Sequence, residues 1–129
     1  MNSDEIKALD QQYVMQTYRR NPLAIDHGKG AVLWSPEGKE YIDFTSGIGV
    51  CSLGCANEAW ANAIYQQAMK VGHISNLFYT EPYAKLASKL VPAAGMKAEF
   101  FGNSGAEANE GMIKTARKWS FEKYGEGRA

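Results

Sequence analysis

The sequence predicts an α/β protein whose β-sheet is incomplete within the 129 residues. An apolar segment at residues 99–101 leads through Gly102-Asn103-Ser104-Gly105 into a helical pattern, as in a strand–turn–helix unit. Two more short strands flank a turn at residues 35–39 that contains proline and then glycine. Apolar residues at helical spacing recur in three other segments, at residues 4–18, 58–71 and 80–92.

Composition and charge exclude several classes of protein. Fourteen Lys and Arg residues balance fourteen Asp and Glu residues without a basic run, so we expect no nucleic-acid partner. A membrane-spanning helix would need about 18 consecutive apolar residues, and none is present, so we expect no membrane partner. The polar, acidic start at residues 1–5 differs from a secretory signal, which predicts a cytoplasmic location.

The first part of the chain is predicted to form a helix and then a small antiparallel sheet. The helix spans residues 4–18, with Ser3 as its N-cap. An extended segment follows up to Pro22, because the residue before proline disfavours the helical conformation. After a hairpin opening at Gly28-Lys29-Gly30, residues 31–34 and 41–44 are predicted to be strands.

The middle of the chain is predicted to alternate loops and helices. The glycine-rich stretch at residues 46–54 is too flexible to form a core element by itself. A helix over residues 58–71 is predicted to start at the N-cap Asn57 and to stop at Gly72. The apolar run 77–79 in the next loop is expected either to form a subunit interface or to be buried in the chain's own core.

The last two helices carry clear start signals. Thr80 offers a capping hydroxyl before a helix that Pro92 and Gly95 end. Ser104 is the predicted N-cap of the final helix, and Glu107 three residues later predicts a capping box. The unpaired N–H groups of such a helix start attract anions, and Gly105 leaves the main chain accessible to a phosphate. The alternative is an ordinary strand-to-helix turn without a ligand.

The cysteines and histidines do not predict a metal site. Cys51 and Cys55 are separated by three residues and no second pair accompanies them, so we expect two free thiols in preference to a zinc site or a disulfide. His27 and His73 lack partners at metal-ligand spacing and are expected to be structural or surface residues.

The stretch from Phe100 to Glu110, together with Ile113-Lys114-Thr115-Ala116-Arg117-Lys118, resembles the signature of the class III pyridoxal-phosphate (PLP) aminotransferases. Within that family it resembles the branch that moves an amino group from N2-acetyl-L-ornithine to 2-oxoglutarate in arginine biosynthesis. The ornithine and succinylornithine branches share these motifs and stay open. The resemblance implies a fold-type I PLP-dependent transferase in which Ser104, Gly105 and Ala106 hold the cofactor's phosphate.

The resemblance extends towards the N-terminus. Residues 17–22 match the family pattern Thr-Tyr-x-Arg-x-Pro, which implies that Tyr18 and Arg20 contact the substrate. The alternative is that Tyr18 packs and Arg20 is a solvated charge. The glycine-rich loop at residues 46–54 is implied to reach the substrate end of the cofactor. The family usually continues Gly-His-x-His-Pro, but this chain has Gly54-Cys55-Ala56-Asn57-Glu58.

The resemblance covers most of this chain but only the front part of the family's length. It implies that residues 1–57 are the N-terminal segment of a small domain and that residues 58–129 begin the PLP-binding large domain. The lysine that binds the cofactor covalently is expected beyond Ala129, so no catalytic residue is assigned, Glu110 receives no chemical step, and the chain alone is expected to be inactive. The complete enzyme is expected to be a homodimer. The rival interpretation is a non-catalytic module that binds a phosphate ligand or a partner.

Overall fold

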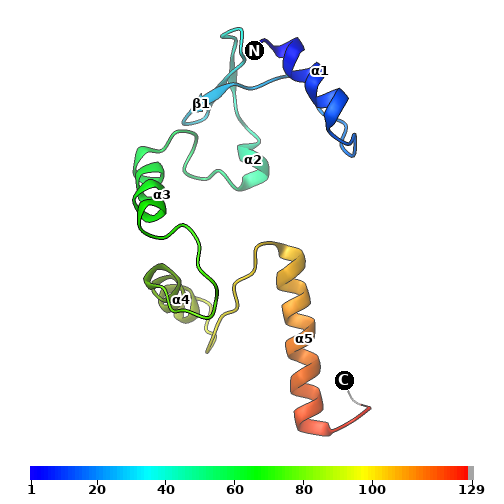
Figure 1. The fold of residues 1–129 in the computed structure, drawn as a ribbon, viewed down its shortest axis with the longest axis vertical. Helices are drawn as coiled ribbons and strands as arrows, with labels where there is room; N and C mark the ends of the chain where they lie inside the picture. Colours follow the sequence, from blue (N-terminus) through cyan, green and yellow to red (C-terminus); the bar gives the residue numbers. More distant parts are fainter. Residues whose placement is uncertain (128–129) are drawn as a thin grey trace. The chain divides into compact units, whose positions relative to one another are not determined.

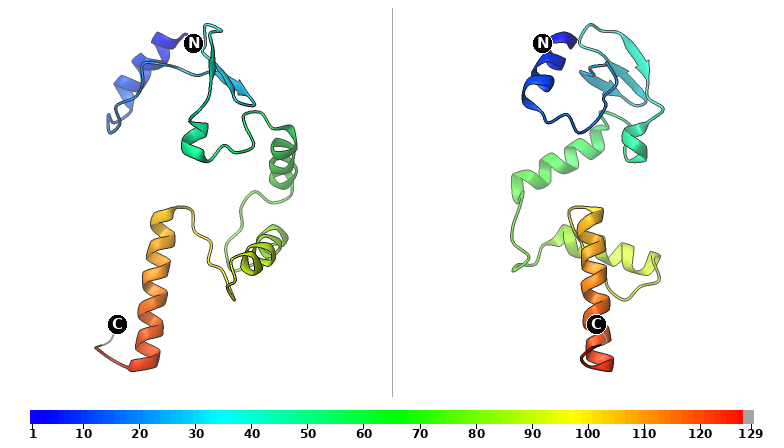
Figure 2. Two further views of the ribbon diagram at one scale, coloured as in Figure 1. Left: turned by 180° about the vertical axis from the view of Figure 1, so that it is seen from behind. Right: turned by 90° about the vertical axis from the view of Figure 1, so that its right-hand side faces the viewer.

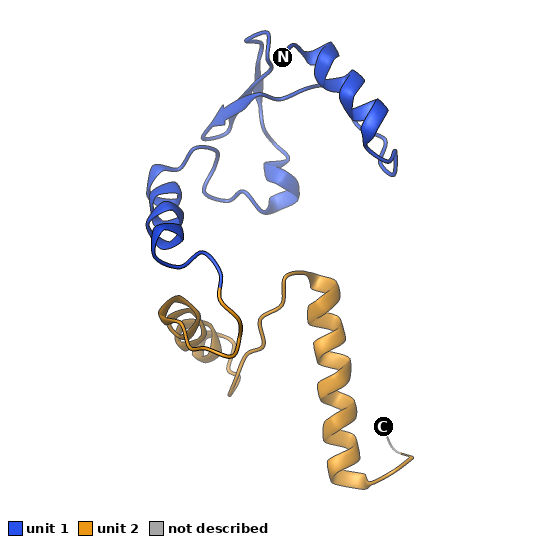
Figure 3. Cartoon of the chain, viewed as in Figure 1, with its two compact units in different colours: residues 1–73 blue, residues 74–129 orange. Residues whose placement is uncertain are grey.

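The computed structural model describes residues 1–127, and the chain divides into two compact units, Met1–His73 and Ile74–Ala129 (Figure 3). Figure 1 labels the elements along the chain. The first unit contains, in order, α1 (Ser3–Tyr13), β1 (His27–Lys29), β2 (Val32–Trp34), β3 (Glu40–Ile42), α2 (Ser46–Gly49) and α3 (Glu58–Lys70). The second unit contains α4 (Glu81–Ala93) and α5 (Gly105–Tyr124).

Helix α1 begins one residue earlier and ends five residues earlier than its sequence predicts. Asn2, not Ser3, is the N-cap: its Oδ1 accepts from the Glu5 N–H at 2.9 Å, and the Glu5 carboxylate accepts from the Asn2 N–H at 3.0 Å. This reciprocal pair is a capping box. At the other end the Gln16 amide donates to the carbonyls of Asp10 and of the C-cap Val14, which ties the chain back onto the last turn of the helix.

The three strands form an antiparallel meander in the order β1-β2-β3 (Figure 2). Strands β2 and β3 correspond to the predicted strands 31–34 and 41–44, but β2 starts one residue later and β3 spans residues 40–42. Strand β1 was not predicted, because Gly and Lys have low β-propensity. Cross-strand packing fixes it instead: His27 is paired with Trp34, and their rings stack with centroids 5.0 Å apart. Gly28 is required there, since a Cβ would lie 2.7 Å from Leu33 Cδ2 and 2.8 Å from Cys55 Sγ.

A carboxylate in the β2–β3 turn holds the start of α1. Both the backbone N–H and the hydroxyl of Ser3 donate to Glu37, each at 2.7 Å. The hydrogen bond from the Ser3 hydroxyl is the largest cause that lowers the pKa of Glu37 from 4.5 to about 2. The bonds therefore favour the ionised carboxylate and join two segments 34 residues apart.

This contact is expected to be lost in acid. Because the pKa of Glu37 is lower in the folded chain, the stabilisation is complete above pH 4.5 and is lost as the pH falls towards about 2. In an NMR titration of the complete protein, the Ser3 amide resonance should shift over this range. Glu37→Gln should abolish that shift and Glu40→Gln should leave it unchanged. A Ser3 resonance that titrates normally in the Glu37→Gln protein would contradict the assignment.

Helix α3 follows its prediction closely. The Asn57 side chain accepts from the Trp60 N–H at 3.0 Å, which confirms the predicted N-cap. The helix ends at Lys70 with Val71 as an extended C-cap, so the prediction that Gly72 stops it was wrong by one residue. Its apolar face, which includes Trp60, lines an open groove of about 340 Å³.

The predicted strand at residues 99–101 is not formed in the second unit. A strand exists only when a neighbour accepts its hydrogen bonds, and among residues 1–127 no segment pairs with it. Side-chain contacts hold this segment instead. Phe101 meets Tyr83 of α4 edge to face at 4.6 Å, and Phe100 lies so close to Gly111 of α5 that a Cβ there would sit 2.9 Å away.

The start and end of α4 also differ in detail from the prediction. Thr80 occupies the N-cap position, but its side chain makes no capping hydrogen bond. Pro82 lies in the first turn, where its missing N–H is not needed. Pro92 lies inside the last turn, and the helix continues to Ala93, before Gly95 adopts a φ of +65°.

Apolar faces are left largely uncovered within each unit. Among the described residues, Ala24 is the only buried hydrophobic residue, while Trp60 is 58% exposed and Leu86 48%. The loop residues Leu77 and Tyr79 are 85% and 106% exposed, so the alternative that they are buried in the chain's own core was wrong. No helix within residues 1–127 has the length and hydropathy that a membrane span requires.

Candidate functional site

The first turn of α5 is built by its N-cap. Ser104 is extended, with φ −150° and ψ 161°, and its hydroxyl oxygen accepts from the Glu107 N–H at 3.2 Å. Its carbonyl accepts from the Ala108 N–H at 3.0 Å, so the helix begins directly after it. The predicted N-cap is therefore confirmed, and a helix of 20 residues directs its positive dipole end at this turn.

The second half of the predicted capping box is displaced by one residue. The Glu107 carboxylate accepts from the backbone N–H of Asn103 and not from that of Ser104. A Cβ on Gly102 would lie 3.2 Å from Glu107 Cβ, so the glycine leaves room for this side chain to fold back. This hydrogen bond fixes the turn that precedes the helix. It also keeps the Glu107 carboxylate, the nearest acidic group, bound to the backbone.

Two backbone donors of this turn are free to bind an anion. Within residues 1–127 the N–H groups of Gly105 and Ala106 donate no hydrogen bond. A Cβ on Gly105 would have no atom within 4 Å, so the space over the main chain is open. Ser104, Gly105 and Ala106 are all exposed. Paired N–H donors at a helix start, with open space above them, fit a phosphate such as that of PLP.

The N-cap hydroxyl is expected to contribute to stability. Ser104→Ala removes the acceptor for the Glu107 N–H and should lower the free energy of unfolding by about 1 kcal/mol. Thr115→Ala, which removes a hydroxyl from the middle of the same helix, is the matched control and should not destabilise the protein. Urea denaturation of the complete protein checks this. Equal midpoints for wild type and Ser104→Ala would contradict the role of the cap.

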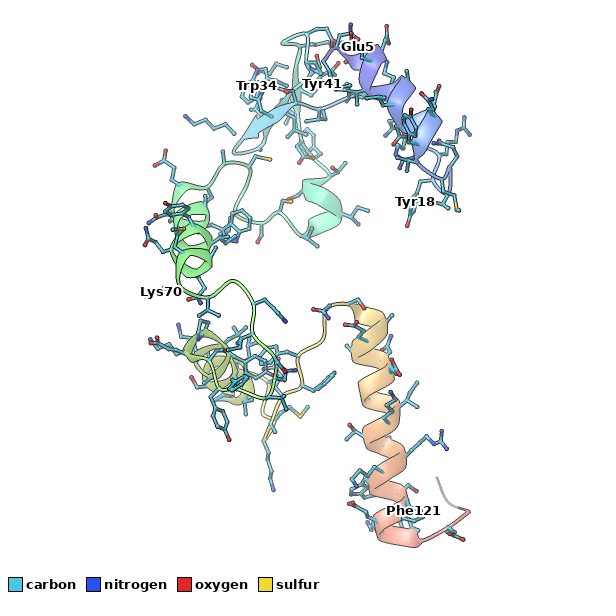
Figure 4. The ribbon with its side chains drawn as sticks, viewed as in Figure 1. Glu5, Tyr18, Trp34, Tyr41, Lys70 and Phe121 are labelled. Atoms are coloured by element: carbon cyan, nitrogen blue, oxygen red, sulfur yellow. The ribbon has the colours of Figure 1, made fainter. Side chains whose placement is uncertain are left out.

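The N-terminal residues predicted to contact a substrate lie in the segment after α1. Tyr18 is 76% exposed, so it does not pack on described residues, and Figure 4 shows it beside the end of α1. Arg20 pairs with Asp10 of α1, with Nη1 and Oδ2 3.4 Å apart. The Arg20 guanidinium thus pairs with one carboxylate and is still accessible to a ligand, since the side chain is 45% exposed. Tyr18 and Arg20 belong to the first unit, whereas Ser104–Ala106 belong to the second.

Glu110 and the two cysteines have identifiable surroundings. Glu110 forms an ion pair of 2.5 Å with Lys114 one turn along α5. Cys51 is an exposed free thiol and Cys55 a partly buried one. The backbone of Cys55 exchanges two hydrogen bonds with Gly30, at 2.8 and 2.9 Å, which attaches residues 54–56 to the meander. Within residues 1–127 no group of three or more His, Cys, Asp or Glu residues could hold a metal ion.

Sequence reasoning overlooked Asp43, which organises the glycine-rich loop. Its Oδ1 accepts from the Thr45 hydroxyl at 2.7 Å, from the Thr45 N–H at 2.8 Å and from the Ser46 N–H at 2.9 Å. These bonds, first the one from the Thr45 hydroxyl, lower the pKa of Asp43. The spacing Asp-x-Thr before a glycine-rich stretch is a turn signal that could have identified it.

Comparison with known proteins places these features in a family context. The family model for the aminotransferases of class III matches residues 13–129. The acetylornithine aminotransferase of Haemophilus ducreyi is 56% identical over 129 residues, which is 100% of this chain and 33% of that protein. The chain thus spans about a third of the length of this curated relative.

Solved structures agree with the sequence match. The acetylornithine aminotransferase from Elizabethkingia anophelis superposes with a TM-score of 0.88 at 33% identity, over 97% of this chain and 33% of that one. The ornithine aminotransferase from Toxoplasma gondii, whose structure has partial occupancy of PLP at its active site, gives a TM-score of 0.86 at 32% identity. That match covers 94% of this chain and 28% of the Toxoplasma chain.

Proposed function

Because the chain belongs to the class III aminotransferases, we propose that the complete protein transfers the amino group of N2-acetyl-L-ornithine to 2-oxoglutarate with PLP as cofactor. The observation that carries this proposal is the open first turn of α5, with two free N–H donors, in a chain 56% identical to an acetylornithine aminotransferase. The donor–acceptor pair places the reaction in arginine biosynthesis.

Ser104, Gly105 and Ala106 are proposed to hold the phosphate of PLP. The free N–H groups of Gly105 and Ala106 donate to phosphate oxygens, and the dipole of α5 stabilises their negative charge. Ser104 keeps the turn in shape through its bond to Glu107. Bound PLP supplies the electron sink that makes amino-group transfer possible, while the protein provides orientation and charge.

Tyr18 and Arg20 are proposed to bind the substrate. A guanidinium grips a carboxylate with two parallel hydrogen bonds, and the side chain of Arg20 is accessible for this. The exposed side chain of Tyr18, two residues before Arg20, offers an apolar ring for packing and a hydroxyl for hydrogen bonding. In this proposal the pair with Asp10 keeps the guanidinium of Arg20 in place before the carboxylate arrives.

The uncovered apolar faces fit a larger assembly. We propose that residues 1–57 belong to the small domain and residues 58–129 to the PLP-binding large domain, and that the complete protein is a homodimer. The exposed residues Leu77, Phe78 and Tyr79 are the surface proposed to meet the second subunit. A cytoplasmic location remains a prediction from the sequence.

Steady-state kinetics of the complete protein test the proposal. Glutamate formation should require both N2-acetyl-L-ornithine and 2-oxoglutarate. Ornithine is the second donor to test, because the solved ornithine aminotransferase is a structural neighbour, and succinylornithine is the third. The isolated 129 residues should be inactive with every donor, since the lysine that holds PLP is expected outside them. A complete protein that binds PLP but transaminates none of the three would favour the non-catalytic module.

A further inference from the structure

The glycine-rich loop contains a left-handed turn that includes two residues other than glycine. Helix α2 has φ values of 47° at Ser46, 60° at Gly47, 64° at Ile48 and 79° at Gly49. Glycine adopts such values freely, but a β-branched residue such as Ile48 rarely does. Strained backbone of this kind persists only when the surroundings impose it, and it gathers at functional sites.

Packing of the loop's apolar side chains does not impose this conformation. Ile48 is 94% exposed and Val50 77% exposed, so neither is held by described residues. Cys51 lies against the turn, since a Cβ on Gly47 would be 2.9 Å from its Sγ, but its own side chain is exposed. Among the described residues, the contacts that hold the turn are therefore those of its polar groups.

Asp43 supplies those polar contacts from a fixed position. Its own N–H donates to the Ala31 carbonyl at 2.8 Å, which joins it to the meander one residue after β3 ends. A single carboxylate oxygen, Oδ1, then accepts three hydrogen bonds, two from Thr45 and one from the Ser46 N–H. The left-handed residues start at Ser46, and the N–H of Ser46 donates to Asp43, so the start of the turn is bound to the end of β3.

The loop and Asp43 together border a cavity. Its volume is about 170 Å³, and its polar lining includes Asp43, Ser46 and Ser52. Asp43 lies at the base of the loop with its Oδ1 already engaged by three donors. Its carboxylate is therefore suited to holding the loop and not to exchanging a proton.

We propose that Asp43 is a positioning residue for substrate binding, which holds the loop 44–54 in its left-handed form and so shapes this cavity. The inference rests on the proposed aminotransferase function, in which the loop reaches the substrate end of the cofactor. Asp43 should therefore affect the binding of the amino donor but not the binding of the cofactor's phosphate.

The test compares Asp43→Ala, Asp43→Asn and Thr45→Val in the complete protein. Asp43→Ala loses all three acceptor contacts, so amide hydrogen exchange of residues 45–50 should speed up at least tenfold, and KM for the amino donor should rise about tenfold. The value of kcat should stay within about twofold, and PLP affinity should not change. Asp43→Asn keeps an acceptor oxygen and should restore most of the wild-type KM. Thr45→Val should give a smaller change in the same direction.

A matched control and the exchange readout separate the possible failures. Asp26→Ala removes another meander carboxylate, which contacts His27 and not the loop, and should alter neither KM nor the exchange of residues 45–50. Wild-type exchange rates in Asp43→Ala would overturn the positioning role. So would a rise in KM together with falls in kcat and Tm that Asp43→Asn does not restore. If the wild type transaminates no donor while Asp43→Ala still loosens the loop, the proposed function fails, and the role in substrate binding is overturned with it.

Discussion

A Gly105→Leu variant of the complete protein should bind PLP at least about 100-fold more weakly than the wild type, because its side chain blocks two phosphate contacts. The N–H groups of Gly105 and Ala106 lack acceptors within the described part of the chain, and the space above Gly105 is open. A leucine side chain would fill the volume in which the phosphate is proposed to lie. Each hydrogen bond to a charged group contributes about 1.5–3 kcal/mol, so losing both costs about 3–6 kcal/mol, which corresponds to a factor of at least about 100.

The substitution itself should not unfold the helix. No described atom lies within 4 Å of the added Cβ, and leucine has a higher helix propensity than glycine. Gly72→Leu is the matched control, because the Cβ there would meet only the Ala68 carbonyl oxygen at 4.0 Å and Gly72 belongs to the first unit. Fluorescence titration with PLP checks both variants. Unchanged PLP affinity in Gly105→Leu would contradict the phosphate role of this turn.

Replacement of Arg20 by alanine should raise KM for N2-acetyl-L-ornithine by about 10- to 100-fold, which corresponds to one charged, bidentate contact. The value of kcat should change much less, since the contact serves the substrate and the transition state alike. Arg20→Lys should not restore the wild-type KM, because an ammonium group lacks the planar pair of donors.

Arg19 provides the matched control for this experiment. It is the neighbouring exposed arginine, and no ion pair joins it to the described residues. Arg19→Ala should therefore leave KM unchanged. If both alanine variants behave alike, Arg20 is a solvated charge that pairs with Asp10, and the substrate role assigned to it is wrong.

The sequence predicted the features that depend on local chemistry. The N-caps Asn57 and Ser104 were predicted correctly because a short polar side chain before an apolar helical pattern has one favoured use. Strands β2 and β3 were predicted from the apolar segments that flank the turn at residues 35–39. The first cap was misassigned because Asn2 and Ser3 are both good N-caps, and only the reciprocal bond to Glu5 distinguishes them.

Features that depend on distant neighbours were not predictable in the same way. The segment 99–101 has the composition of a strand, but a strand also needs a hydrogen-bonding neighbour, which the described residues do not supply. Strand β1 formed against its propensity because His27 stacks on Trp34. Asp43 was overlooked because its importance comes from a left-handed turn that glycine-rich composition alone does not specify.

The position of the phosphate in a crystal structure of the complete protein with PLP tests the central claim most directly. We expect phosphate oxygens within hydrogen-bond distance of the N–H groups of Gly105 and Ala106, at the start of α5. A phosphate bound elsewhere, with this turn open to solvent or covered by another segment, would contradict the assignment of the cofactor site.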